Sequence, residues 1–298
     1  MRVFVTGATG FIGSALIPKL VAGGHQVLGL SRSEAGARSL AAAGAEVHRG
    51  DIYDLESIRS GAAKADAVIH LAFNHDFSRF QENCETDRRV IEAIGGVLAG
   101  SDGMFLITSG VATASPKAGQ PATEDDPPMN SSLMPRAASE EQGAAVGARG
   151  VRVVTVRLPQ VHDTRKQGLV SFAIQIARQK GVAAYVGEGR SRWAAAPLDD
   201  VAHLYHLALE KGEGNVRYNA VAEEGVAARD IAEAIGRGLK IPAVSIAPEE
   251  ATAHFGVLGM FMQWDLVGSS AKTREKLGWN PTGPTLLSDL ENMDYSQA

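Results

Sequence analysis

Cysteine is nearly absent from this chain of 298 residues, which has Cys84 alone. A single cysteine cannot form an intrachain disulfide, and this argues against a secreted, disulfide-stabilised protein. Catalysis by this thiol is also disfavoured, because its neighbours Asn83 and Glu85 carry no positive charge that would stabilise a thiolate.

Long apolar runs and blocks of basic residues are missing as well. The chain has no apolar run of the roughly 18 residues that would suggest a membrane span, and no charged leader with a cleavage site precedes its first strand. The net charge of -5, with no run of five basic residues, argues against a nucleic-acid surface. We therefore expect a cytoplasmic protein that binds a small molecule and neither nucleic acid nor membrane.

Glycine, by contrast, is plentiful, at 33 of 298 residues. Gly7, Gly10 and Gly13 lie between a strand expected at 2–6 and a helix expected at 11–23. At such a junction the first glycine permits a tight turn, the second admits a pyrophosphate close to the backbone, and the third lets helix and strand pack together. The helix N-terminus adds unpaired N–H donors and partial positive charge. The pattern predicts a dinucleotide site; the alternative is a tight turn in another α/β protein.

This turn resembles the first turn of the extended and atypical short-chain dehydrogenase/reductase families, which reads Thr-Gly-x-x-Gly-x-x-Gly. The resemblance extends over nearly the whole chain, and its motifs are most specific in the first third. It implies a Rossmann domain that binds NAD(P), followed by a smaller lobe that binds substrate. The cofactor contacts implied within the turn are Gly7, Thr9, Gly10, Phe11, Ile12 and Gly13.

Segments typical of strands and helices alternate through the first half of the chain. The expected strands are 2–6, 26–30, 45–48, 67–71, 104–108 and 151–158, and the expected helices are 11–23, 34–43, 54–60, 79–99 and 136–148. This alternation predicts an α/β fold with a doubly wound parallel sheet. After residue 168 the pattern is less regular, with helices expected at 169–180, 199–211 and 227–239 and a strand at 216–219. We expect 1–167 to form the Rossmann domain and 168–298 a small α+β substrate lobe, interleaved with it.

The cofactor preference depends on the end of the second strand, where an NAD site usually carries Asp or Glu for the ribose 2′-hydroxyl. Here the chain reads Ser31-Arg32-Ser33, with no acid before Glu34. Arg32 can pair with a 2′-phosphate, and the two serines can add hydrogen bonds. We therefore expect NADP (NADPH); in the alternative, the cofactor is NAD and Arg32 is a solvated turn residue.

Further cofactor contacts are implied after later strands. Residues 51–52 resemble the family's pair of Asp and a hydrophobic residue near the adenine amino group. Residues 70–73 resemble its His-Leu-Ala segment beside the riboses, and residues 157–162 resemble a segment that folds over nicotinamide. The contacts implied by these resemblances are Asp51, Ile52, Leu71, Ala72, Phe73, Pro159 and Val161.

The family's usual catalytic pair, Tyr-x-x-x-Lys, does not occur in this chain. Alignment back from the expected strand at 151–158 puts Ser132 at the Tyr position and Arg136 at the Lys position, and Ser109 falls where the family carries its serine. Arg136 is permanently charged, so it can hold a ribose hydroxyl or developing negative charge but cannot be the acid. His162, which titrates near neutral pH, is a further candidate proton donor. The alternatives are a solvated Arg136 in a first helical turn and a His162 that is merely hydrogen-bonded.

Other polar residues give weaker signals. The proline-rich segment 113–135 is expected to be a long loop at the active-site mouth, or else a solvated surface loop. His75 and Asp76 form a further candidate pair near the same edge. No metal-binding motif is present in the sequence. His203 and His206 share an expected helix with Asp199, but the simpler role for that acid, or for its neighbour at 200, is to cap the N-terminus of the helix. We expect no metal.

The sequence favours an NADP-dependent oxidoreductase of the atypical short-chain type, which transfers hydride to a small carbonyl substrate. The proton would come from His162, from water, or from Ser132 in a relay with Arg136. Two alternatives stay open: an NADP(H)-binding sensor without turnover, and a nucleotide-sugar epimerase or dehydratase-like enzyme. Dimerisation through a four-helix packing is common in the resembling family, and we expect a homodimer on that ground alone.

Overall fold

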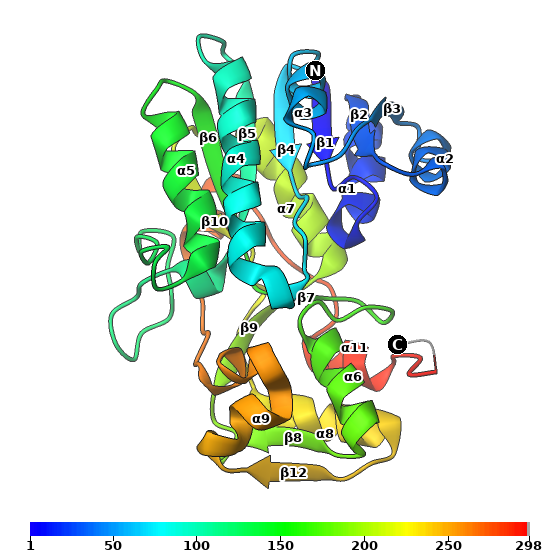
Figure 1. Ribbon diagram of the computed structural model, residues 1–298, viewed down its shortest axis with the longest axis vertical. Helices are drawn as coiled ribbons and strands as arrows, with labels where there is room; N and C mark the ends of the chain where they lie inside the picture. Colours follow the sequence, from blue (N-terminus) through cyan, green and yellow to red (C-terminus); the bar gives the residue numbers. More distant parts are fainter. Residues whose placement is uncertain (297–298) are drawn as a thin grey trace.

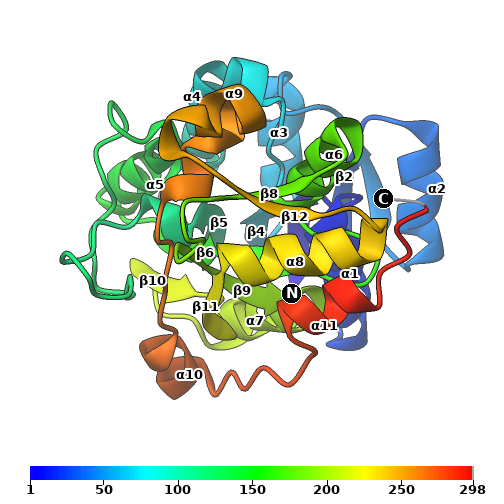
Figure 2. The ribbon, with the colours of Figure 1, turned by 90° about the horizontal axis from the view of Figure 1, so that it is seen from below.

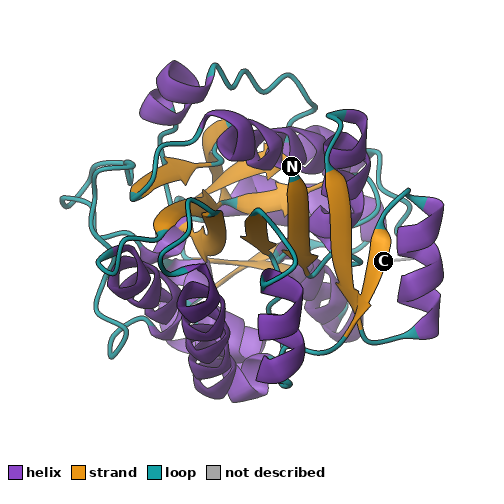
Figure 3. Cartoon of the chain, turned by 90° about the horizontal axis from the view of Figure 1, so that it is seen from above, coloured by secondary structure: helices purple, strands orange, loops and turns teal. Residues whose placement is uncertain are grey.

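A seven-stranded parallel sheet forms the centre of the computed structural model, which describes residues 1–296. Its strand order is β3-β2-β1-β4-β5-β6-β10. The strands are β1 (Arg2–Thr6), β2 (Gln26–Ser31), β3 (Glu46–Arg49), β4 (Ala67–His70), β5 (Met104–Gly110), β6 (Arg152–Leu158) and β10 (Val216–Asn219). Figure 3 shows helices on both faces of this sheet. The expected doubly wound α/β fold is confirmed.

Alternate residues of the central strands supply two separate cores. On one face, Val3 and Val5 of β1 pack in a core with α1 (Phe11–Ala22) and α7 (Leu198–Lys211). On the other face, Phe4 packs in a core with α3 (Leu55–Ala62) and α4 (Phe80–Leu98). Helix α5 (Ala138–Gly147) lies beside α4, and α2 (Glu34–Ala42) lies at the β3 side of the sheet (Figure 1). A strand buried on both faces accounts for the apolar runs of β1, β4 and β5.

The later part of the chain forms a smaller lobe, drawn below the sheet in Figure 1. Its strands are the parallel pair β8 (Ala183–Val186) and β12 (Ala243–Ile246) and the three-stranded sheet of β7 (Gln160–His162), β9 (Arg192–Pro197) and β11 (Glu223–Ala227). Its helices are α6 (Val170–Lys180), α8 (Ala228–Leu239), α9 (Ala251–Phe255) and α11 (Leu286–Glu291). Figure 2 shows α8 and α11 side by side on this lobe.

Two segments that follow residue 168 return to the large sheet. Helix α7 packs against α1, and β10 pairs with β6. The buried Trp279, which follows α10 (Ala271–Leu277), donates its Nε1–H to the Asp200 carbonyl of α7 at 2.9 Å. The expected division into 1–167 and 168–298 therefore does not separate the two lobes in space. Helix α7 and strand β10 come after residue 168 in the chain but pack in the layers of the large sheet.

The expected helices and strands are present with ends displaced by at most two residues, but the expected helix cap differs from the structure. Asp199 is not a cap: α7 begins at Leu198 after Pro197, and the Asp199 carboxylate pairs with Lys19 at 2.7 Å. The segment 114–134 contains no helix or strand, yet it is anchored, because the buried Glu124 carboxylate accepts hydrogen bonds from Thr273 N and Oγ1 at 2.9 and 2.6 Å. Within residues 1–296, no helix has the length and apolar character needed to cross a membrane.

Candidate active site

A cleft of about 1040 Å³ lies between the carboxyl ends of the central strands and the smaller lobe. The strand ends contribute residues that follow β1, β2, β3, β4, β5 and β6. The lobe contributes mainly apolar side chains, among them Phe172, Trp193, Phe261 and Leu266. The chain order of the sheet reverses between β1 and β4, and open α/β sheets bind their ligands at such a point.

The glycine turn after β1 has a backbone that only glycine allows. Gly7 has φ of 66°, and a Cβ there would lie 2.7 Å from the Ala72 nitrogen. A Cβ at Gly13 would lie 2.2 Å from the Gly7 carbonyl oxygen. Gly10 is the N-cap of α1 and supplies no capping side chain, so the first N–H groups of that helix remain for a ligand. These groups line the cleft and fit a pyrophosphate.

Arg32 lies on the cleft at the end of β2, with 78% of its side chain exposed. Its Nη1 is 3.8 Å from Asp51 Oδ2, which is too long for a hydrogen bond. The first acid of the segment, Glu34, forms an ion pair with Arg49 instead. This end of the cleft therefore presents a guanidinium beside a loosely paired carboxylate.

The two serines that flank Arg32 also line the cleft. The Ser31 hydroxyl donates to the Ser33 carbonyl at 3.1 Å, and Ser33 Oγ caps α2 by accepting from Gly36 N at 3.1 Å. The other cofactor contacts expected along the strand ends all line the cleft too: Thr9, Phe11, Ile12, Asp51, Ile52, Leu71, Ala72, Phe73, Pro159 and Val161. The residues expected from the sequence to contact the cofactor therefore lie together on the surface of one cleft.

Beneath this surface runs a chain of buried hydrogen bonds. Thr6 Oγ1 is 2.6 Å from His70 Nδ1, and His70 Nε2 is 2.9 Å from Asp87 Oδ1. The second carboxylate oxygen of Asp87 accepts from Arg136 Nη1 at 2.8 Å and from Ser139. Burial opposes ionisation of Asp87, but the guanidinium and His70 outweigh it and lower the pKa of the carboxyl to about 2.

Arg136 is held in place at the floor of the cleft. Besides its bond to Asp87, its Nη2 donates to the Thr108 carbonyl at 2.7 Å, and its guanidinium carbon lies 4.3 Å from the centre of the Phe73 ring. Only 15% of its side chain is exposed, and it lines the cleft. The structure thus presents a fixed cation at the floor of the cleft, and its equivalence to the lysine of the resembling families stays a prediction.

Ser109 also lines the cleft, at the end of β5. Its hydroxyl is 3.1 Å from Thr113 Oγ1, which donates to Glu140 Oε1 at 2.7 Å. Glu140 in turn accepts two bonds of 2.8 Å from the fully buried Arg157. Burial raises the pKa of the Glu140 carboxyl, yet the Arg157 and Thr113 contacts prevail and lower it. A buried ion pair therefore fixes the serine side of the cleft.

Two expected catalytic residues lie away from the cleft. His162 is completely buried and does not line it; its Nδ1 is 2.7 Å from Asp289 Oδ2 of α11. Ser132 is exposed on the surface loop and is also absent from the lining. Loop 113–135 reaches the cleft only at its ends, through Thr113 and Met134. These positions argue against His162 and Ser132 as proton donors and against the loop as the active-site mouth.

Other cleft residues carried little or no sequence signal. Lys166 Nζ lies 5.5 Å from the ring centre of Phe11, the first residue of α1, and both residues line the cleft, so this cation can balance pyrophosphate charge. His75 lies at the same cleft, and its pKa is lowered by burial and by the positive charges of Arg136 and Lys166. Lys166 stands in an irregular turn without a motif, so only the folded chain shows its position.

The comparisons with known proteins agree with this geometry. The sequence profile of the NAD dependent epimerase/dehydratase family matches residues 3–221. The chain belongs to this family. An uncharacterized protein of Schizosaccharomyces pombe is 44% identical to it over 99% of this chain and 100% of its own length, and one of Saccharomyces cerevisiae is 41% identical over 97% and 98%. A UDP-glucose 4-epimerase of Streptomyces lividans is 27% identical over 94% and 92%.

Solved structures show the same fold. The UDP-glucose 4-epimerase of Thermus thermophilus in complex with NAD superposes with a TM-score of 0.76 at 20% identity, over 100% of this chain and 98% of that one. A UDP-glucuronic acid 4-epimerase of Bacillus cereus, in complex with UDP-glucuronic acid and NAD, gives 0.74 at 18% identity, over 100% and 98%. At the level that the family supports, this epimerase/dehydratase-family protein is an NAD(P)-dependent enzyme.

Proposed function

We propose that this epimerase/dehydratase-family protein is an NADPH-dependent oxidoreductase that reduces the carbonyl group of a small, largely apolar molecule. The observation that carries the cofactor choice is the exposed guanidinium of Arg32 on the cleft, while Glu34 is paired with Arg49. A 2′-phosphate would meet a cation there, together with the Ser31 and Ser33 side chains. An acid held toward the ribose would instead favour NAD.

Bound NADPH would supply the hydride that reduces the substrate carbon. The glycine turn and Lys166 would hold the pyrophosphate, and the segment from Leu71 to Phe73 would lie along the riboses. Ser109 would donate a hydrogen bond to the substrate oxygen, and the fixed charge of Arg136 would stabilise negative charge that develops there.

The proton that completes the reduction is assigned to water in the cleft. His75 is disfavoured as a cationic acid, because burial, Arg136 and Lys166 lower its pKa and leave the imidazole neutral near pH 7. A neutral imidazole can still accept a hydrogen bond from such a water. Tyr205 does not replace the missing tyrosine either, since it is fully buried and its hydroxyl is 2.7 Å from Thr108 Oγ1.

The substrate side of the cleft is aromatic, which argues for an apolar carbonyl compound. The rings of Phe77 and Phe172 meet edge to face with centres 5.3 Å apart, and Phe77 and Phe80 are 5.5 Å apart. Trp193 adds a fourth aromatic ring, from the smaller lobe. Such a lining gains free energy from ring burial and offers few partners to a sugar hydroxyl.

The test is NADPH oxidation with a panel of aromatic and aliphatic ketones and aldehydes, for the wild-type protein and two serine variants. We expect turnover that Ser109→Ala lowers at least tenfold and that Ser132→Ala leaves unchanged, because only Ser109 lies at the cleft. Tight NADPH binding without turnover of any carbonyl would favour the sensor.

One observation favours a second candidate, an epimerase or dehydratase-like reaction. That chemistry begins with removal of a hydroxyl proton by a base, and the neutral His75 imidazole at the cleft could be that base. Interconversion of a nucleotide sugar with no net NADPH consumption, abolished by His75→Ala, would support this candidate and overturn the reductase.

A further inference from the structure

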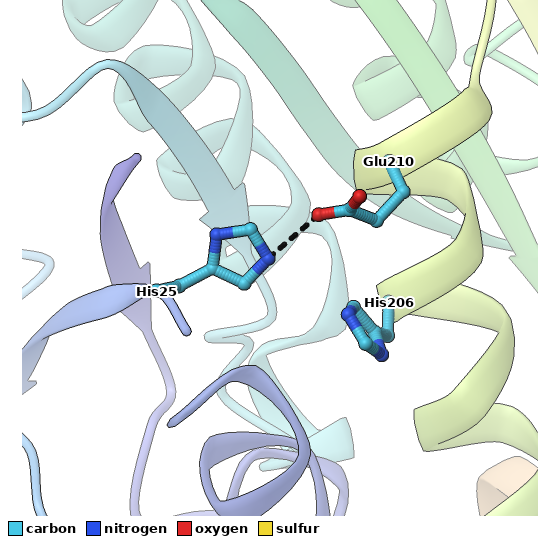
Figure 4. A group of neighbouring side chains, drawn as sticks. All are labelled: His25, His206 and Glu210. Carbon is cyan, nitrogen blue, oxygen red and sulfur yellow. Dashed lines mark ion pairs between the residues drawn. The ribbon is translucent and has the colours of Figure 1, made fainter. Parts of the chain in front are cut away.

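Three side chains from two distant parts of the sequence converge at the end of the molecule opposite the cleft. His25 precedes β2, whereas His206 and Glu210 lie one turn apart on α7. One ligand atom of each residue lies within 4.8 Å of the other two, and Figure 4 shows the three side chains turned toward one another.

His25 is the most informative member of this group. The residue is more than nine-tenths buried, yet neither ring nitrogen makes a hydrogen bond of normal geometry within the described chain. Its Nε2 lies 2.8 Å from Glu210 Oε1, the contact drawn as a dashed line in Figure 4. A buried polar group without proper hydrogen bonds is costly, and such an atom needs an explanation.

The backbone around the group leaves room for both imidazoles. The two rings meet edge to face, with centres 5.7 Å apart. A Cβ at Gly23 would lie 2.7 Å from His206 Nε2, so the glycine at the end of α1 lets this ring sit against the backbone.

We propose that His25, His206 and Glu210 bind one transition-metal ion of the Zn²⁺ class, with water completing the coordination. Two imidazoles and one carboxylate form a ligand set that Zn²⁺ uses, with bonds of about 2.0–2.2 Å. One pair of ligand atoms is already 2.8 Å apart and all three lie within 4.8 Å of one another, so rotation of the side chains would bring them around one ion. The nearby cation Lys19 is paired with Asp199, and this reduces its repulsion of an ion.

The site would tie two layers of the fold together without touching the chemistry. It joins the turn between α1 and β2 to the end of α7, and none of its three residues lines the cleft. A bound ion stabilises the folded state by mass action, so it should raise the unfolding temperature while leaving NADPH affinity unchanged.

The experiment is calorimetric titration of the full-length, tag-free protein with ZnCl₂ after chelator treatment. We expect one equivalent to bind, and saturating Zn²⁺ to raise the melting temperature by roughly 5 °C. Glu210→Gln and His206→Ala should each weaken binding at least tenfold. His203→Ala is the matched control, because this exposed histidine lies on the same helix outside the ligand group. Co²⁺ should give the visible absorption of a low-coordinate nitrogen and oxygen site, lost in Glu210→Gln.

Two results would overturn the proposal. One is the absence of a stoichiometric site in the wild-type protein, with only weak binding spread over several sites. The other is an affinity that is the same in the wild type and in Glu210→Gln, a variant whose exposed side chain does not threaten folding. Because His206→Ala removes a partly buried ring, its melting temperature without metal is measured alongside to separate lost binding from lost folding.

Discussion

Replacement of Asp87 by asparagine should reveal how much the polar chain beneath the cleft stabilises the protein. The carboxylate is almost fully buried and receives hydrogen bonds of 2.8 and 2.9 Å from Arg136 and His70. Asp87→Asn keeps the shape of the side chain but removes its charge. The variant leaves the guanidinium of Arg136 in a largely buried position without a counter-charge.

The magnitude follows from the pKa of Asp87, which is about 2 against an ordinary value of 3.8. That difference corresponds to about 2 kcal/mol of stability at neutral pH. Because the folded-state pKa is depressed, the contribution is present above about pH 5 and is lost as the pH falls toward about 2. The uncompensated Arg136 adds to the cost, and we expect Asp87→Asn to lower the free energy of unfolding by about 3–5 kcal/mol at pH 7.

The assay is urea unfolding followed by tryptophan fluorescence at several pH values. The gap between wild type and Asp87→Asn should narrow by about 1 kcal/mol between roughly pH 5 and pH 3, because the Asp87 carboxyl of the unfolded wild-type chain gains its proton over this range while the folded one stays ionised. Asp102→Asn, at an exposed position, is the control and should stay within about 0.5 kcal/mol of wild type. A gap below 1 kcal/mol at pH 7, or one that does not change with pH, would refute the reasoning.

Three further predictions concern the cleft and its surroundings. Gly13→Ala should weaken NADPH binding at least tenfold, because the new Cβ would meet the carbonyl oxygen of residue 7 at 2.2 Å. Gly96→Ala is the control, because this glycine of α4 has open space around it and the substitution should raise stability by about 0.5–1 kcal/mol. NADPH titration and thermal unfolding are measured for both variants. His162→Asn should lower the free energy of unfolding by about 1–3 kcal/mol through loss of the contact with Asp289, yet leave the NADPH dissociation constant unchanged. A large change in that constant would show that His162 acts in the cofactor site. Lys166→Ala should weaken NADPH and NADH binding to the same degree, and an effect on only one of them would contradict a pyrophosphate role.

The cofactor side of the cleft could be predicted from the sequence because its constraints are local. At Gly7 and Gly13 any Cβ would meet neighbouring backbone. Because a strand precedes this turn and a helix follows it, few folds are compatible with the pattern. The central strands were equally clear, since burial on both faces requires continuous apolar runs. Strands β7 and β9 are not predicted by the sequence, because they are short and gain their stability from pairing with each other in the three-stranded sheet of the smaller lobe.

The proton donors could not be placed from the sequence, since their positions depend on how one segment turns relative to another. His162 follows β6 as the resembling motif requires, but its ring is buried against Asp289 of the last helix. Ser132 is only four residues from Arg136, yet Arg136 lies in the short helical turn Pro135–Ala137 and lines the cleft, whereas Ser132 lies in the exposed loop before it. The His25 group could not be predicted from the sequence, because His25 is far in the chain from His206 and Glu210 and only the packing of α1 on α7 brings it to them.

The most direct test of the account is a parallel fluorescence titration of the purified protein with NADPH and NADH. We expect tight binding of NADPH and weaker binding of NADH, with Arg32→Ala weakening NADPH at least tenfold while NADH changes little. Arg38→Ala, an exposed arginine on α2 away from the cleft, is the matched control and should bind both as the wild type does. Equal losses for both nucleotides in Arg32→Ala would contradict the 2′-phosphate assignment. Binding of neither nucleotide by the wild type would contradict the cofactor site itself.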